Sequence, residues 1–177
     1  MKGLEQFQFG NVYLLNKKYN LEKILEEIST LPDLSSENQV MLQGTKENSN
    51  YHLHSTEQYD INDSVFSELL FDIPYINSII KELNLYRTRI MGLKPKTCLT
   101  WHRDRFRRIH IPLITHWRCL VVVEDKAIHL PADGSAYYVD TSKFHTVFNG
   151  TFDVTRLHLV GSVLPQIIDD KITSWAG

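Results

Sequence analysis

The chain has 177 residues, of which 42% are hydrophobic and 23% charged, so it is long enough for one domain that buries its core without disulfides. A formal net charge of −2, from 19 Lys and Arg against 21 Asp and Glu, excludes the strong basic field typical of nucleic-acid or anionic-membrane partners. No apolar run reaches the length of a membrane span, the first residues lack a signal-peptide core, and the two cysteines have no paired spacing, so we expect a single cytoplasmic domain over 1–177.

The first 84 residues are expected to form a helical and irregular N-terminal part. Asn20, a residue that caps helices, precedes a run in which apolar residues recur at helical spacing as far as Ile28. A second run begins at Asp63 and continues to Ile73, and Pro74, which suits the first turn of a helix, opens a third. These patterns predict three helices.

Residues 35–59, between the first two predicted helices, are polar and rich in Ser, Asn, Gln and Glu. This composition is typical of an extended loop. Its length and polarity suggest the hypothesis that the segment closes over a functional site as a lid.

Residues 85–164 have the sequence pattern of β-strands. Eight short runs rich in β-branched and aromatic residues are separated by turn signals such as 131–134 (PADG) and Asn149-Gly150. Short strands at regular spacing predict a sandwich or barrel, and the eight-stranded option is a jelly roll. The expected fold class is therefore mainly β with N-terminal helices, and 165–177 form a short tail.

One predicted strand carries a metal-binding pattern. His102 and Asp104 are two residues apart, so on a strand both side chains point to the same side of the sheet. His145, from a later strand, can complete a set of two imidazoles and one carboxylate, the facial triad of non-haem Fe(II) oxygenases. With eight His and 21 acidic residues, chance alone supplies about one H-x-[DE] pair, so the motif needs support from its surroundings.

The surroundings give that support through strand alternation. Three predicted strands carry polar, chemistry-capable groups on one face and aliphatic residues on the other. These groups are Thr100, His102 and Asp104 on the first strand, Arg108 and His110 on the second, and Arg156 and His158 on the third. A solvated outer face explains any one strand, but the three together favour an interior polar cavity.

The order of these motifs resembles a known family. An L-x-P turn precedes the H-x-D pair, and an R-x-H-x-P-L-x-T run begins at Arg108. Gly134 and a pair of tyrosines follow, then H-x-V-x-N from His145 and R-x-H-L from Arg156. From Arg87 to Gly161 the chain resembles the aspartyl/asparaginyl β-hydroxylase-like branch of the 2-oxoglutarate- and Fe(II)-dependent oxygenases, which includes free-proline hydroxylases. Residues 1–84 carry no motif of this kind.

The resemblance implies a double-stranded β-helix, a cupin-like jelly roll, that binds Fe(II) through His102, Asp104 and His145. It implies 2-oxoglutarate as cosubstrate, with its distal carboxylate on Arg156, whose guanidinium offers a planar fork and stays charged in a closed pocket.

Three further residues have less defined implied roles. Arg108 and His110 would help to hold the cosubstrate or the substrate, and Thr100 is a weaker candidate for a cosubstrate hydrogen bond. The implied reaction is hydroxylation of an amino acid, and free proline, a free acidic amino acid and a residue in a peptide all remain open.

Three alternatives remain beside this interpretation. A cupin-type metal enzyme that does not use 2-oxoglutarate needs no fixed partner for a distal carboxylate, so Arg156 argues against it. A non-catalytic ligand-binding β-barrel would not depend on Asp104. The arginines of 103–108 could contact nucleic acid, but a solvated loop explains them more simply, and we expect neither a nucleic-acid nor a membrane partner.

Overall fold

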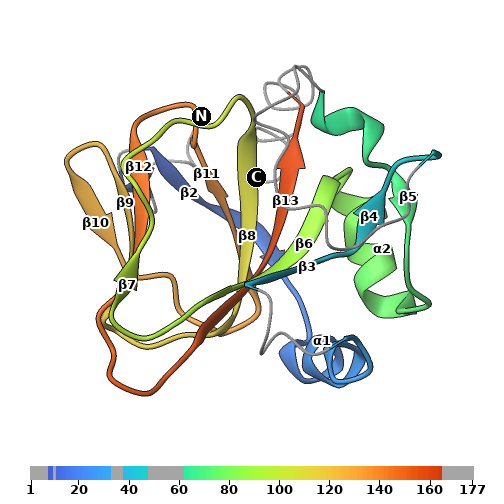
Figure 1. Ribbon diagram of the computed structural model, residues 1–177, viewed down its shortest axis with the longest axis horizontal. Coiled ribbons are helices and arrows are strands. Elements are labelled where there is room, and N and C mark those ends of the chain that lie inside the picture. The colour runs from blue at the N-terminus through green and yellow to red at the C-terminus, as the bar shows by residue number, and fades with distance from the viewer. Residues whose placement is uncertain (1–7, 10, 33–37, 48–61, 165–177) are drawn as a thin grey trace.

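The computed structural model describes residues 8–9, 11–32, 38–47 and 62–164, which form short strands and two α-helices (Figure 1). The strands of the N-terminal part are β1 (Gln8–Phe9), β2 (Val12–Lys18), β3 (Gln39–Met41), β4 (Gln43–Gly44) and β5 (Glu68–Leu69). The helices are α1 (Leu21–Ile28) and α2 (Pro74–Leu83). The remaining strands are β6 (Tyr86–Leu93), β7 (Thr97–Cys98), β8 (Arg107–Ile114), β9 (Cys119–Val123), β10 (Lys126–Ile128), β11 (Ser135–Val139), β12 (His145–Asn149) and β13 (Arg156–Val163).

Two antiparallel sheets make up most of the fold. The larger has the order β1-β2-β11-β8-β13-β6-β3, and the smaller has the order β10-β9-β12-β7. From β6 onward the chain passes back and forth between these two sheets (Figure 1). The expectation of a mainly β protein with helices in its N-terminal part is confirmed.

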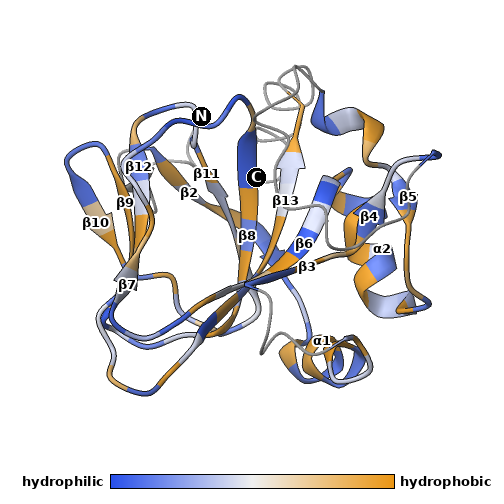
Figure 2. Cartoon of the chain, viewed as in Figure 1, coloured by the Kyte–Doolittle hydropathy of each residue, from blue (hydrophilic) through white to orange (hydrophobic). Residues whose placement is uncertain are grey.

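The larger sheet has an apolar face and a polar face. Along β8, Ile109, Ile111 and Leu113 belong to the main hydrophobic core together with Ile76 and Ile79 of α2. Figure 2 shows the apolar and polar residues alternating along the strands. Because successive side chains point to opposite faces, the residues between these aliphatics lie on the face turned away from the helices.

Both helices begin where the sequence indicates. The Asn20 side chain accepts a hydrogen bond from the Lys23 amide at 3.1 Å, which caps α1. Pro74 occupies the first turn of α2, and the Glu27 carboxylate accepts from the amides of Tyr75 and Ile76 at 2.7 and 2.8 Å. Glu27 therefore satisfies free amides at the start of α2 and ties the two helices together.

The helix predicted from Asp63 to Ile73 is wrong. A single 3-10 turn, Asp63–Val65, is followed by β5, which pairs with β4. The Leu70 amide donates to the Leu42 carbonyl at 3.0 Å, and the Phe66 side chain is buried. Pairing with a distant segment has overridden the local apolar spacing.

The N-terminal part also supplies more strand than expected. Strand β2 extends the larger sheet beyond β11, and β3 extends it beyond β6. Within residues 38–47, expected in the loop, the chain forms the two short strands β3 and β4. Residues 48–59 of the proposed lid lie outside the described residues. Neither described helix is long and apolar enough to cross a membrane.

Replacement of Gly134 tests the turn that leads into β11. Gly134 has φ +84°, its carbonyl accepts from the Tyr19 amide at 2.8 Å, and an added Cβ would lie 2.1 Å from the Tyr19 carbonyl oxygen. We expect Gly134→Ala to lower the free energy of unfolding by at least about 1–3 kcal/mol in urea denaturation. Gly92, where an added Cβ meets nothing closer than 3.6 Å, provides the control. Equal losses in Gly134→Ala and Gly92→Ala would contradict this account of the turn.

Candidate functional site

The segment that carries His102 and Asp104 is not the continuous strand that was expected to carry Thr100, His102 and Asp104. Strand β7 ends at Cys98, and beyond it a single bridge joins His102 to His145 at the start of β12. The His102 amide donates to the His145 carbonyl at 3.1 Å, and the His145 amide donates to the His102 carbonyl at 2.8 Å. The Asp104 amide donates to the Thr141 carbonyl at 2.8 Å. The backbone therefore brings the three residues together without a regular ladder.

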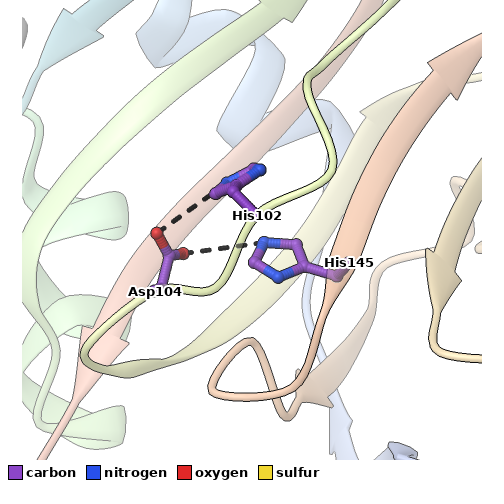
Figure 3. A group of neighbouring side chains, drawn as sticks. All are labelled: His102, Asp104 and His145. Atoms are coloured by element: carbon purple, nitrogen blue, oxygen red, sulfur yellow. Dashed lines mark ion pairs between the residues drawn. The ribbon is translucent and has the colours of Figure 1, made fainter.

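Figure 3 shows the three side chains converging from two segments. Their ligand atoms all lie within 4.8 Å of one another. The Nε2 atoms of His102 and His145 are 3.9 and 3.8 Å from the two carboxylate oxygens of Asp104. These distances are too long for hydrogen bonds, so the three side chains do not pair with one another, and each keeps a lone pair for a metal ion.

Backbone carbonyls orient both imidazoles. Nδ1 of His102 is 2.6 Å from the Thr100 carbonyl oxygen, and Nδ1 of His145 is 3.0 Å from the Lys143 carbonyl oxygen. Donation from Nδ1 to these carbonyls leaves Nε2 unprotonated and directed toward Asp104. This is the tautomer that a metal site requires of its histidines.

The electrostatics favour the forms that bind a metal. Burial opposes ionisation of Asp104, but the Arg108 guanidinium, with Nε 2.8 Å from the carboxylate, lowers the pKa of Asp104 below its ordinary value. Burial lowers the pKa of His145 despite the nearby carboxylate. At neutral pH the site therefore contains an ionised carboxylate and a neutral imidazole, as metal ligands must be.

This donor set leaves room for further ligands. Within the described residues, no other group of three or more His, Cys, Asp or Glu could hold an ion. The His102 side chain is 30% exposed, whereas that of His145 is 5% exposed. Two imidazoles and one carboxylate with open positions suit Fe(II) oxygen chemistry, whereas structural zinc usually has four closed ligands.

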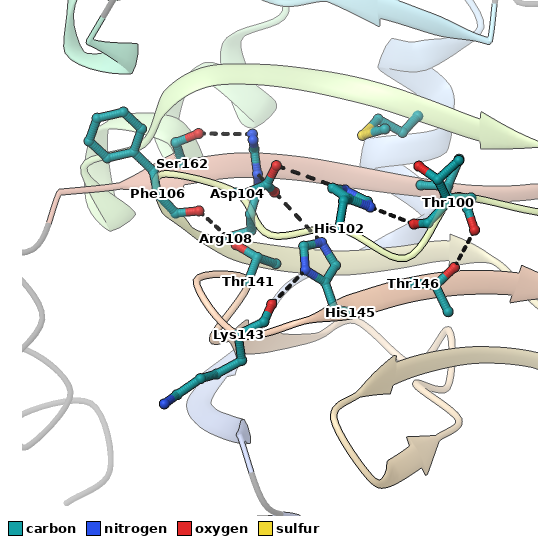
Figure 4. Close-up of polar contacts among 12 residues, drawn as sticks. Thr100, His102, Asp104, Phe106, Arg108, Thr141, Lys143, His145, Thr146 and Ser162 are labelled. Carbon is teal, nitrogen blue, oxygen red and sulfur yellow. Dashed lines mark hydrogen bonds and ion pairs between the residues drawn. The ribbon is translucent and has the colours of Figure 1, made fainter. Parts of the chain in front are cut away.

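Arg108 belongs to a buried network behind Asp104 (Figure 4). Its Nη1 donates to the Ser162 hydroxyl at 3.0 Å, and that hydroxyl donates to the carboxylate of Asp63. Nη1 of Arg87 also lies 3.3 Å from Asp63. The sequence did not point to Asp63, whose partners are far away in the chain. Arg108 was expected to hold a cosubstrate or substrate. The structure gives it another role, because it hydrogen-bonds the candidate metal ligand Asp104.

A second cluster on the same face of the sheet contains Arg156, His110 and His158, all buried. Nη2 of Arg156 lies 2.8 Å from Nδ1 of His158, and among the described residues no carboxylate pairs with Arg156. Nδ1 of His110 and Nε2 of His158 are buried without a hydrogen-bond partner. Buried polar atoms are normally paired, so this cluster fits a polar, anionic ligand.

Charge supports the same interpretation of the cluster. Burial lowers the pKa of Arg156 to about 10, so the guanidinium remains charged at neutral pH. Burial, and then the Arg156 charge, lower the pKa values of His110 and His158 well below the ordinary value, so both stay neutral. The cluster is one buried cation flanked by two neutral imidazoles.

Thr100 differs from its expected place. Its side chain is exposed rather than turned inward, because the chain has left the strand by that point. The backbone of Thr100 contributes instead, through the carbonyl that faces His102.

The chain matches one protein-family model over most of its length. The model of the family described as Aspartyl/Asparaginyl beta-hydroxylase matches residues 18–165. The chain belongs to the aspartyl/asparaginyl beta-hydroxylase family. Among curated protein sequences, none matches it.

Two solved structures resemble this member of the beta-hydroxylase family. One is an oxidoreductase of the 2OG-Fe(II) oxygenase family from Burkholderia pseudomallei, with a TM-score of 0.51 and 15% identity, covering 86% of this chain and 83% of that one. The other is AviO1 from Streptomyces viridochromogenes Tue57, with a TM-score of 0.51 and 10% identity, covering 92% of this chain and 94% of that one. At these identities the likeness shows the fold alone.

Loss of the carboxylate ligand tests the metal site. We expect Asp104→Asn to lower the affinity for Mn(II) by at least about 100-fold, and Ser162→Ala, which acts through Arg108, by about tenfold. Equilibrium binding of Mn(II) followed by electron paramagnetic resonance measures both. His116→Gln, which alters a histidine outside the triad, serves as the control. Native Mn(II) affinity in Asp104→Asn would rule out this centre.

The buried histidines predict how stability depends on pH. Above about pH 6.5 these imidazoles are neutral in both the folded and unfolded chains. As pH falls below that value, His110 and His158 become protonated in the unfolded chain. In the folded chain they stay neutral, because their pKa values are lowered, so the free energy of unfolding falls. The slope is about 1.4 kcal/mol per pH unit for each such histidine.

Urea denaturation of the metal-free protein across about pH 5–7 measures this slope. His158→Gln removes one of the protons and should flatten the dependence. A variant with the native slope would show that His158 titrates normally in the folded chain.

Proposed function

We propose that this chain is a 2-oxoglutarate- and Fe(II)-dependent oxygenase that hydroxylates an amino acid, either free or in a peptide. The observation that carries the proposal is a buried cation beside a candidate metal site. Arg156 has no carboxylate partner among the described residues, and it shares a face of the larger sheet with His110. Besides burial, the charges of Arg156 and of the ligands His145 and Asp104 all act on the pKa of His110, which links the cluster to the triad. When bound, Fe(II) and 2-oxoglutarate supply the oxidation: dioxygen gives one oxygen atom to a substrate C–H bond and the other to succinate, with release of carbon dioxide.

The order of the strands supports a double-stranded β-helix of the jelly-roll, cupin-like type. If the eight strands of residues 86–163 are numbered I to VIII along the chain, the larger sheet contains them in the order VI-III-VIII-I. The smaller sheet contains V-IV-VII-II. Odd and even strands are thus interleaved across two sheets, as winding a long hairpin into two layers requires.

Each residue of the site has a role in this proposal. His102, Asp104 and His145 hold the metal, and the Thr100 and Lys143 carbonyls keep the two imidazoles in the correct tautomer. Arg156 pairs with the distal carboxylate of 2-oxoglutarate, because a guanidinium presents two parallel donors to a carboxylate.

The two buried histidines complete the cosubstrate pocket. Nε2 of His158 must carry its proton, because Nδ1 faces Arg156, and it supplies a hydrogen-bond donor beside the guanidinium. His110 offers a buried Nδ1 from the neighbouring strand. In this proposal Arg108 orients Asp104, to which its Nε donates.

The alternatives lose support from the same contacts. A cupin-type enzyme without 2-oxoglutarate does not account for the buried Arg156. A binding barrel without a metal does not account for the two imidazoles whose Nε2 atoms are directed toward Asp104. Two of the four arginines in the run are engaged inside the protein, because Arg107 donates to Asp140 at 3.3 Å and Arg108 is buried. We therefore propose an amino-acid substrate and no nucleic-acid partner.

The test uses purified protein with Fe(II) and 2-oxoglutarate under anaerobic conditions. We expect a weak visible absorption band from the chelate, and slow succinate formation after oxygen is admitted. Arg156→Met should raise the KM for 2-oxoglutarate by about 10–100-fold, since it removes a charge-assisted hydrogen bond.

Arg118→Gln, which removes a cation from the turn between β8 and β9, provides the control and should behave as the native protein does. Absence of both the band and succinate at saturating iron would refute the oxygenase proposal.

A further inference from the structure

Arg89 is a buried cation that the proposed function has not used. It lies on β6 directly opposite Val160 of β13, which in turn lies opposite His110 of β8. Opposite residues of antiparallel strands share a face, so Arg89 lies on the same face as His110. Arg89 is 7% exposed.

The Arg89 guanidinium has no anionic partner among the described residues. Its Nε donates to the Met91 sulfur at 3.2 Å, a weak acceptor, and its Nη1 is buried with no hydrogen-bond partner. A buried, unpaired charge is costly. The fold therefore maintains an unfavourable group at this position.

The neighbouring charges do not compensate for Arg89. The carboxylate of Asp63 is already engaged by Arg87 and Ser162. Asp104 is engaged by Arg108 and belongs to the triad. The guanidiniums of Arg87 and Arg108 thus occupy the two carboxylates that lie nearest to Arg89. Burial first, and then Arg108 and Arg87, lower the pKa of Arg89 well below its ordinary value, yet an arginine keeps its proton in a protein.

The anion that Arg89 lacks is not the distal carboxylate of 2-oxoglutarate. Arg156 precedes Val160 by four residues on β13, a separation of roughly 13 Å along the strand. The two carboxyl carbons of a five-carbon diacid are roughly 5 Å apart at about 1.5 Å per bond. The charges that act on Arg89 are those of Arg108, Arg87, Asp104 and Asp63, and Arg156 is not among them. A distal carboxylate held by Arg156, at the other end of β13, therefore leaves Arg89 without an anion.

We propose that Arg89 binds a carboxylate of the primary substrate beside Asp104, so that the substrate is an amino acid with a free α-carboxylate or an acidic side chain. This inference rests on the proposed function and narrows its substrate class. A neutral residue within a peptide would leave the guanidinium unpaired in the complex, whereas a carboxylate accepts two parallel hydrogen bonds from it.

A binding role and a structural role predict opposite effects on stability. Arg89→Met keeps most of the side-chain volume and removes the unpaired charge, so the ligand-free variant should melt higher than the native protein by at least about 2–4 °C. Arg87→Met is the matched control two residues away, because it breaks the buried pair with Asp63 and should lower the Tm. A fall in Tm for Arg89→Met would mean that Arg89 supports the fold, and would overturn the proposal.

The binding test uses the full chain loaded with Mn(II) and saturating 2-oxoglutarate in the absence of oxygen, with acetate as the carboxylate probe and acetamide as its neutral isostere. Acetate should raise the Tm of the native complex, acetamide should not, and Arg89→Met should lose the acetate shift while keeping the shift caused by 2-oxoglutarate. No acetate shift in the native complex, or the same shift in Arg89→Met, would overturn the assignment of Arg89. No shift with 2-oxoglutarate itself would instead contradict the proposed function, and with it the inference.

Discussion

The ion pair between Asp104 and Arg108, 2.8 Å from carboxylate oxygen to Nε, connects the candidate metal centre to the sheet. Asp104 lies in a segment with little strand pairing, so its backbone alone does not fix the carboxylate. Arg108 belongs to β8, near the centre of the larger sheet. Its hydrogen bond therefore fixes the Asp104 carboxylate relative to the sheet. Its own position depends on Ser162 and Asp63. The turn at Asp63 therefore makes the N-terminal part a component of the site as well as a support for the sheet.

The two faces of the larger sheet have different roles: one forms the hydrophobic core, and the other carries the candidate site. The face toward α1 and α2 is a continuous aliphatic core. The opposite face buries Arg89, Arg108 and Arg156 with two neutral histidines, at a cost in desolvation that only ligands and a few carboxylates can offset. We expect such a face to destabilise the ligand-free protein and to be stabilised by the anions and the metal that we propose it binds. The protein is expected to gain stability from its ligands.

Local sequence patterns predicted the elements whose signals are themselves local. The Asn20 cap and Pro74 predicted the starts of α1 and α2, and alternation along β8 and β13 predicted that Arg108 and Arg156 share a face. The sequence did not predict the turn and strand after Asp63, because the apolar spacing there also suits a helix. Only pairing with β4, many residues earlier, decides between the two. Asp63 itself could not be found from the sequence, since Arg87 and Ser162, its partners, are 24 and 99 residues away.

The dependence of cosubstrate binding on the metal tests the central claim most directly. Calorimetric titration of 2-oxoglutarate, without oxygen, would compare the Mn(II)-loaded protein with the metal-free protein. If the triad and Arg156 form one site, 2-oxoglutarate should bind the loaded protein at least about tenfold more tightly, because part of its affinity comes from the metal. Equal affinity with and without Mn(II) would show that the triad and the anion cluster are independent, and would contradict the account.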